Sequence, residues 1–323
     1  MEKTKIKRKR DNVFRIIVKY VIIISLCLLI LLPSIADVLF SFMTKGDLCD
    51  PSVIFIPRNV TFDNYRTMAD VLYFNDTLKE SLVLSLIVAI IQVVMCSFTA
   101  YGFARFKFPL KKLWMGALFI VITFIPVITA YSLNLNFKFF DFFGIISAIK
   151  GEPIRLVGKT QAQILMCVFC MGIRSGMIIY FFYSFFRGIP DDIEEASYID
   201  GSGCFRTYFK IMLPQAKSIL GTGFLMTFIW QYMDGFYAKC FMSDELLLGP
   251  RFARILDLSS LYRVIYRGEY YGQDPLEYSI CLIKTGMIMI VLPMVILYVF
   301  TQLFIFRGID DFTSGVCKRK IKD

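Results

Sequence analysis

Long apolar stretches alternate with shorter polar ones along the whole chain. Each of these stretches has about 20 residues or more, which as a helix crosses the roughly 30 Å hydrocarbon core of a bilayer. The six stretches lie at about 16–42, 81–104, 113–133, 161–186, 218–236 and 281–306. The pattern predicts an all-α, polytopic membrane protein with six transmembrane helices in a single domain, residues 1–323.

Composition supports a membrane protein. Apolar residues make up 57% of the chain and charged residues 19%, whereas a soluble domain of this length carries more charge. A cleaved signal peptide is the competing interpretation of the first stretch, with Ser34 and Ala36 as a cleavage site. The stretch is longer than the 7–15-residue apolar core of a signal peptide and continues past that site, so we expect an uncleaved first span.

Lysine and arginine are unevenly distributed between the polar segments. The two termini and the loops 105–112 and 187–217 hold 21 of them in 75 residues, against 12 in 107 residues for the loops 43–78, 134–160 and 237–280. By the positive-inside rule the richer set is cytoplasmic. We therefore expect both termini and the 187–217 loop in the cytoplasm. The net charge of +10 follows from these membrane flanks and does not indicate nucleic acid binding.

The polar stretch 187–214 carries apolar residues at helical spacing: Ile193, Ala196, Ile199, Phe205, Phe209 and Met212. Asp191 is placed to cap a first helix, with Glu194 three residues later. Gly201 can break the backbone before a second helix, which Pro214 is expected to end. The pattern predicts two short helices outside the bilayer. Because their apolar side chains would face water, we expect a protein partner there.

Glu195-Ala196-Ser197, followed after three residues by Gly201 and after nine more by Ile211-Met212-Leu213-Pro214, resembles the EAA motif of ABC importer permease subunits. That motif reads E-A-A, three residues, G, nine residues, I-x-L-P, and Ser197 is the one departure. The segments 64–65, 100–109 and 306–308 resemble the carbohydrate-uptake branch, in particular the second permease subunit of maltose-type systems.

The resemblance implies a type I ABC importer permease fold and a set of partners. These are a second permease subunit forming a heterodimer, an ABC ATPase dimer, an extracytoplasmic solute-binding protein and a sugar or oligosaccharide substrate. ATP hydrolysis belongs to the ATPase, so we expect a transport subunit of a prokaryotic cell membrane that is not an enzyme and has no cofactor. The resemblance implies that the 187–214 loop docks on the ATPase.

Glu195 is the expected charged contact with the ATPase. The candidate docking residues are Glu195, Ala196, Ser197, Ile199, Asp200, Gly201, Phe205, Phe209, Ile211, Leu213 and Pro214.

Arg174 lies near the middle of the predicted fourth span. A lone cation on the lipid face costs several kcal/mol, so we expect its side chain to face the bundle or a wet cavity. It either hydrogen-bonds substrate oxygens along the transport path or pairs with a polar residue and fixes packing. Gln92, in the second span, is a further candidate of the same kind.

We expect neither a catalytic nor a metal site, since the chain has no histidine and its cysteines lie mostly in apolar runs. Cys49 and Cys240 lie in predicted outer loops, where a disulfide between them is open. The role of the outer loops 43–80 and 237–280 is also open. Three alternatives remain: an importer for another solute such as a peptide or polyamine, a secondary transporter, and a sensor or scaffold without transport.

Overall fold

A computed structural model describes residues 2–123, 126–141, 147, 151–241, 247–256 and 276–320, with side-chain surroundings given for all of these except 2–14, 126–129, 276 and 303–320. The regular elements of this part of the chain are helices, and two isolated β-bridges accompany them. The chain divides into two compact units. One holds residues 1–71 and 255–290, and the other holds residues 72–254 and 291–323.

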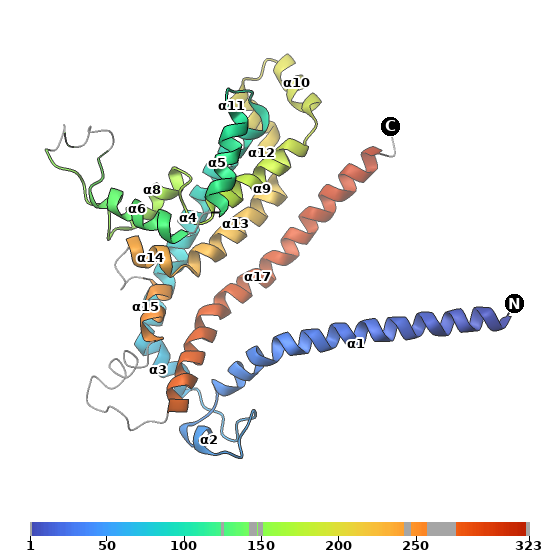
Figure 1. Cartoon of the computed structure of the whole chain (residues 1–323), viewed down its shortest axis with the longest axis vertical. Coiled ribbons are helices and arrows are strands. Elements are labelled where there is room, and N and C mark those ends of the chain that lie inside the picture. The colour runs from blue at the N-terminus through green and yellow to red at the C-terminus, as the bar shows by residue number, and fades with distance from the viewer. Residues whose placement is uncertain are drawn as a thin grey trace. The chain divides into compact units, whose positions relative to one another are not determined.

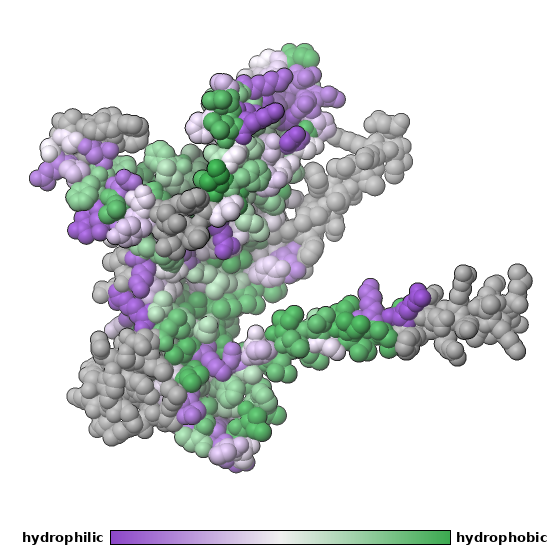
Figure 2. Space-filling model, viewed as in Figure 1, coloured by the Kyte–Doolittle hydropathy of each residue, from purple (hydrophilic) through white to green (hydrophobic). Residues whose placement is uncertain are grey.

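The first unit contains α1 (Glu2–Phe40), α2 (Lys45–Cys49), most of α3 (Asp63–Leu72) and the first turns of α17 (Leu276–Lys320). The consecutive apolar residues 20–24 and 28–32 of α1 are all exposed, so apolar side chains point in every direction around this helix, and Figure 2 shows the face in view. A helix that is hydrophobic all round is typical of a membrane span, since no polar face is left for water.

After α1 the chain turns back on itself. The buried Asn64 side chain donates hydrogen bonds to the carbonyls of Ser41 and Met43, at 3.0 and 2.9 Å. Tyr65 and Ser41 join their hydroxyls at 2.7 Å. These bonds satisfy the last carbonyls of the turn after α1, which otherwise lack partners. The end of α1 is therefore fixed against the start of α3.

The second unit is built around α4 (Phe74–Arg105), with α9 (Ser175–Gly188) and α13 (Lys217–Tyr232) packed along it (Figure 1). Phe182 on α9 is fully buried. A Cβ atom at Gly223 would lie 2.5 Å from the Phe182 ring, so only glycine permits this close packing of α9 and α13. Small residues at such crossings are typical of membrane helix pairs.

The remaining helices of the second unit are shorter. They are α5 (Lys111–Thr123), α6 (Pro126–Lys138), α8 (Thr160–Val168), α14 (Phe236–Phe241) and α15 (Leu248–Ile255), together with four short helical pieces between α9 and α13.

Among the described residues, three helical stretches are long and apolar enough to cross a membrane: Arg15–Phe40, Phe74–Arg105 and Glu277–Gln302. The chain is thus mostly helical and multi-pass, while the count of six spans stays a prediction. The expectation of one continuous helix over 161–186 is wrong. There, α8 ends at Val168 and α9 begins at Ser175.

The helix breaks because Cys170 and Arg174 adopt positive φ angles of 56° and 53°, which an α-helix does not allow. The predicted span 113–133 holds α5 and α6 on either side of residues 124–125, which lie outside the described part. The stretch 218–236 contains α13, of 16 residues, and the start of α14.

Candidate functional site

The polar segment 187–217 folds as a series of short helices at one end of the α4, α9 and α13 bundle (Figure 1). They are α10 (Asp191–Ile199), α11 (Cys204–Thr207), the π-helical turn η1 (Tyr208–Met212) and α12 (Leu213–Gln215). The prediction of a helix, a turn and a second helix is confirmed. The second helix is not uniform, since it passes from α to π and back to α.

Gly201 makes the turn between α10 and α11. Its φ is +75°, in the left-handed region that favours glycine. The N–H of Gly201 donates to the carbonyl of Tyr198, and the N–H of Ser202 donates to that of Ser197, both at 3.0 Å. These two bonds define a Schellman motif, in which the residue after the C-cap must be left-handed. The motif glycine is therefore required by the way α10 ends.

Pro214 does not end the second helix, and that expectation is wrong. It lies inside α12, directly after the π turn. Proline normally clashes with the carbonyl four residues earlier. In η1 the N–H of Leu213 reaches back five residues, to the carbonyl of Tyr208. The wider turn gives the proline ring room, so the helix continues towards α13.

Arg105, the last residue of α4, anchors this segment. Its side chain is 5% exposed. Its Nη2 atom donates to the carbonyls of Phe186 and Ile189, at 2.9 and 2.6 Å. Its Nη1 atom pairs with the carboxylate of Asp191. Asp191 was expected to cap α10, which is wrong, because Pro190 occupies the N-cap position and Asp191 instead binds Arg105.

Glu194, on the inner face of α10, is the second buried charge and is 7% exposed. It accepts hydrogen bonds from the hydroxyls of Tyr101 and Tyr198, both at 2.8 Å. Its Oε2 atom lies 3.2 Å from Nε of Arg105, which makes an ion pair without the direction of a hydrogen bond. Burial, and then the bond to Glu194, raises the pKa of Tyr198. Two residues of α4 therefore hold α10 through one carboxylate.

Sequence reasoning missed this cluster. Arg105 was counted as a topology signal and Glu194 as a helix-start charge. The spacing of Tyr101 and Arg105 was the available signal, because residues four apart share one face of a helix. That face is directed at the polar segment.

The predicted docking residues divide into an exposed and an anchored set. Ile199 is 86% exposed, Phe205 67% and Phe209 55%. Phe205 stacks on Phe98 of α4, with ring centroids 5.9 Å apart, so one face of its ring is covered. The other exposed members are Glu195, Ala196, Asp200, Gly201 and Pro214.

In the anchored set, Ser197 is buried and its hydroxyl lies 2.7 Å from that of Thr207. Ile211 and Leu213 are half-buried. Tyr208, next to Thr207, is buried under Tyr101 and Phe98, at 5.0 and 5.6 Å between ring centroids. The segment thus has one face held by the bundle and one apolar face left open.

Arg174 lies at the break between α8 and α9 and occupies the N-cap position of α9, so it is not inside a helix. Its side chain is exposed, and its guanidinium lies over the Trp230 ring at 4.7 Å. This position places a cation at the positive end of a helix dipole, which disfavours it. Other contacts of Arg174 must therefore compensate for this unfavourable interaction with the helix dipole.

Gln92 is fully buried beside the same break. Its amide donates to the carbonyl of Ile173 at 2.8 Å and to the hydroxyl of Ser175 at 3.0 Å. The first of these bonds satisfies a backbone carbonyl that the interrupted helix leaves unpaired. A role of Gln92 or Arg174 along a transport path stays a prediction. Cys49 and Cys240, for which a disulfide was left open, are both free thiols.

The helical bundle with its terminal polar segment is similar in fold to a chain of a solved ABC transporter. The chain superposes with a TM-score of 0.63 on a chain of a bacterial ABC transporter involved in the import of the acidic polysaccharide alginate. The two are 17% identical, and the match covers 89% of this chain and 95% of the other. This similarity concerns the fold.

Sequence relatives agree with that class. The trehalose transport system permease protein SugB of Mycobacterium tuberculosis is 27% identical, over 81% of this chain and 84% of its own. A putative ABC transporter permease of Caldicellulosiruptor is 29% identical, over 85% and 90%. The maltodextrin transport system permease MdxG of Bacillus subtilis is 23% identical, over 79% and 78%. No protein-family model matches the chain.

The predicted relationship to ABC transporter permease subunits is confirmed by these relatives. The chain is a homologue of transport components of the membrane rather than of enzymes.

Proposed function

We propose that this chain is a permease subunit of an ATP-driven importer that moves a sugar or oligosaccharide, delivered by an extracytoplasmic binding protein. The partners would be a second permease subunit and an ABC ATPase dimer. Relatives along most of the chain are named for trehalose and maltodextrin transport, which supports a carbohydrate substrate. A peptide or polyamine is the second candidate solute, and no observation favours it.

One observation carries this proposal: the segment 191–215 presents an open apolar face while its other face is fixed to α4. Ile199, Phe205 and Phe209 form that open face. Exposed apolar side chains of this size normally meet a partner. Glu195 and Asp200 lie beside them and would contact cations of the ATPase, since charged hydrogen bonds at an interface fix its register.

The fixed face would make the segment a lever. When the ATPase dimer closes on ATP, a displacement of α10 passes to α4 through Arg105 and Glu194. Because α9 and α13 pack along α4, the three helices would move together. Such movement would open the transport path towards the other side of the membrane.

The topology that we propose places both termini and the 187–217 segment in the cytoplasm, in one membrane domain with six spans. The distribution of lysine and arginine supports this orientation. The span at 161–186 would cross as an interrupted helix. Non-helical backbone at membrane depth is tolerated where protein or a water-filled cavity surrounds it. Gln92 supplies such protein contacts for the break before α9.

Arg174 would face that cavity or the second permease subunit. Its guanidinium is exposed in the single chain, and lipid is an unfavourable environment for it. Guanidinium N–H groups are suited to the hydroxyls of a sugar, and the ring of Trp230 beside them offers an apolar surface. We therefore place Arg174 on the substrate path.

The test is transport by the reconstituted complex of both permeases, the ATPase and the binding protein. Ile199→Asp should leave the chain in the membrane but release the ATPase during purification and abolish ATP-dependent uptake. Ser218→Asp, half-buried at the start of α13 beyond the open face, is the matched control and should retain the ATPase. Uptake that proceeds without ATP and stops when ion gradients collapse would refute the importer in favour of a secondary transporter.

A further inference from the structure

The loop that follows α1 presents an uncharged apolar tip. Between Val53 and Pro57 the chain carries no charged residue. Ile54 is 66% exposed, Phe55 50% and Ile56 77%. Three consecutive large apolar side chains in this state are unusual for a surface that faces only water. The tip is therefore expected to have an apolar environment.

Hydrogen bonds and an ion pair hold the loop in one conformation. The hydroxyl of Thr44 accepts a hydrogen bond from the N–H of Asp47 at 3.2 Å and so caps α2. Asp47 in turn accepts from the N–H of Asn59 at 2.9 Å. Arg58 pairs with Asp50 at 3.0 Å, across the base of the tip. The charges at the base are thus bound to each other, and the apolar tip projects from a closed polar frame.

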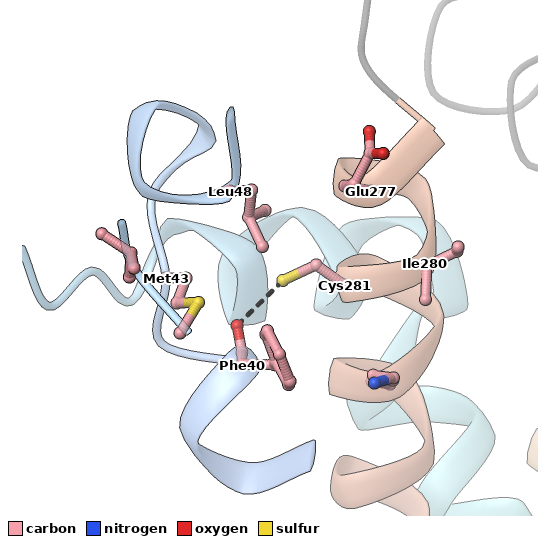
Figure 3. Close-up of a pocket in the computed structure, with 8 residues that line it drawn as sticks. Phe40, Met43, Leu48, Glu277, Ile280 and Cys281 are labelled. Atoms are coloured by element: carbon pink, nitrogen blue, oxygen red, sulfur yellow. Dashed lines mark hydrogen bonds between the residues drawn. The ribbon is translucent and has the colours of Figure 1, made fainter. Parts of the chain in front are cut away.

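The position of the loop relates it to the end of the membrane-crossing helices. Val53 lines a cavity with Phe40, the last residue of α1, and with Cys281 in the first turns of α17 (Figure 3). The thiol of Cys281 donates to the carbonyl of Phe40 at 3.0 Å. Both helices are long and apolar enough to cross a bilayer. If they cross it, these ends of α1 and α17 lie near its surface.

The tip lies close enough to the end of α1 to reach the headgroup layer. Ile56 is three residues from Val53, and an extended chain advances at most about 3.5 Å per residue, so it lies within roughly 10 Å. The polar layer on each side of the hydrocarbon core is roughly 5–8 Å thick. The tip can therefore reach the boundary between headgroups and acyl chains but not the centre of the bilayer.

Aromatic side chains cluster just after the end of α1. Phe42 packs against Phe62 and Tyr65, with ring centroids 5.5 and 5.3 Å apart. Aromatic residues with a polar end, such as Tyr65, are enriched where membranes meet water. One turn earlier, Val38 on α1 is 42% exposed, so exposed apolar side chains on α1 extend to within two residues of its end.

We propose that the tip Ile54–Ile56 inserts into the boundary of the lipid bilayer and anchors the outer end of α1. The occupant of this surface is lipid, because the tip is uncharged and lies close to the end of α1, whose own apolar side chains are exposed as on a membrane span. The proposal requires only that α1 and α17 cross the membrane. It is independent of the solute and of the ATPase, so it can fail while the proposed function stands.

The experiment places a tryptophan at the tip of the assembled complex, reconstituted in phosphatidylcholine vesicles. Phe55→Trp is compared with Arg66→Trp, on the polar face of α3, where the side chain is 83% exposed. The emission of all native tryptophans, including the two of this chain, is subtracted with the parent complex. Brominated phosphatidylcholine probes contact with lipid, and iodide probes contact with water.

We expect the emission added by Phe55→Trp to be blue-shifted, strongly quenched by brominated lipid and little quenched by iodide. Arg66→Trp should show the reverse. Quenching of the tip by iodide alone would place it in water, and quenching by neither agent would place it against another protein chain. Either result overturns the proposal. Ile56→Trp repeats the measurement at the neighbouring exposed position, should the first variant fail to assemble.

Discussion

Arg105→Met removes the guanidinium that holds the polar segment to α4 and keeps a side chain of comparable length. Arg105 is 5% exposed and Glu194 10% in their side chains, so the change strands a carboxylate that solvent hardly reaches. Breaking a buried ion pair from one side costs about 3–5 kcal/mol. The hydroxyls of Tyr101 and Tyr198 still donate to Glu194, which favours the lower end of this range.

That loss corresponds to roughly two to three powers of ten in the equilibrium between attached and detached α10. Hydrogen–deuterium exchange of the amides in 191–199 should therefore accelerate in the purified complex. Transport should lose coupling, so that ATP hydrolysis persists while less solute enters per ATP. Insertion should be spared, because the lost contacts lie at the end of the bundle.

Lys107→Met is the matched control, since it removes an exposed cation two residues further on. It should leave both exchange and coupling close to those of the parent. If Arg105→Met and Lys107→Met gave the same exchange rates and the same solute-to-ATP ratio, the lever described above would be refuted.

Three further changes test other parts of the site. Gly201→Ala should destabilise α10 by about 1 kcal/mol through its positive φ alone, because a Cβ there meets nothing within 4 Å. Gly201→Asn should cost less. Equal melting temperatures for the two variants would contradict the Schellman explanation. Gln92→Leu leaves the carbonyl of Ile173 without its hydrogen bond and should lower the free energy of unfolding by about 1–3 kcal/mol. Thermal melting of the complex measures this loss, and an unchanged melting temperature would contradict it. Arg174→Ala should lower uptake while assembly and ATP hydrolysis persist, whereas lost assembly with normal uptake per complex would make it a packing residue.

Much of the architecture followed from the residue pattern, because membrane helices and amphipathic helices have different periodicities. The two-helix segment 187–214 was predicted from apolar spacing and from the glycine at 201. Hydropathy could not distinguish a continuous helix from two helices joined by a turn, so the break before Ser175 was missed. Its cause is two positive φ angles in an apolar run, at Cys170 and Arg174.

The distinction between Glu194 and Glu195 was also outside the reach of sequence reasoning. The two residues are chemically alike and adjacent, and only the rotation of α10 against α4 decides which is buried. Here Glu194 faces Tyr101 and Arg105. Glu195 is exposed. The motif includes the exposed Glu195 and does not include the buried Glu194.

The π turn at Tyr208–Met212 gives the spacing of the motif a geometric meaning. It contains one residue more than a regular helix needs between Thr207 and Pro214. Deleting one residue there would leave a regular α-helical turn, and the Pro214 ring would again meet the carbonyl four residues before it. The helix would then kink or break at Pro214, at a cost of about 3 kcal/mol or more. The nine residues between Gly201 and Ile211 thus include the extra residue that makes room for Pro214, and a chain one residue shorter would carry the motif on a broken helix.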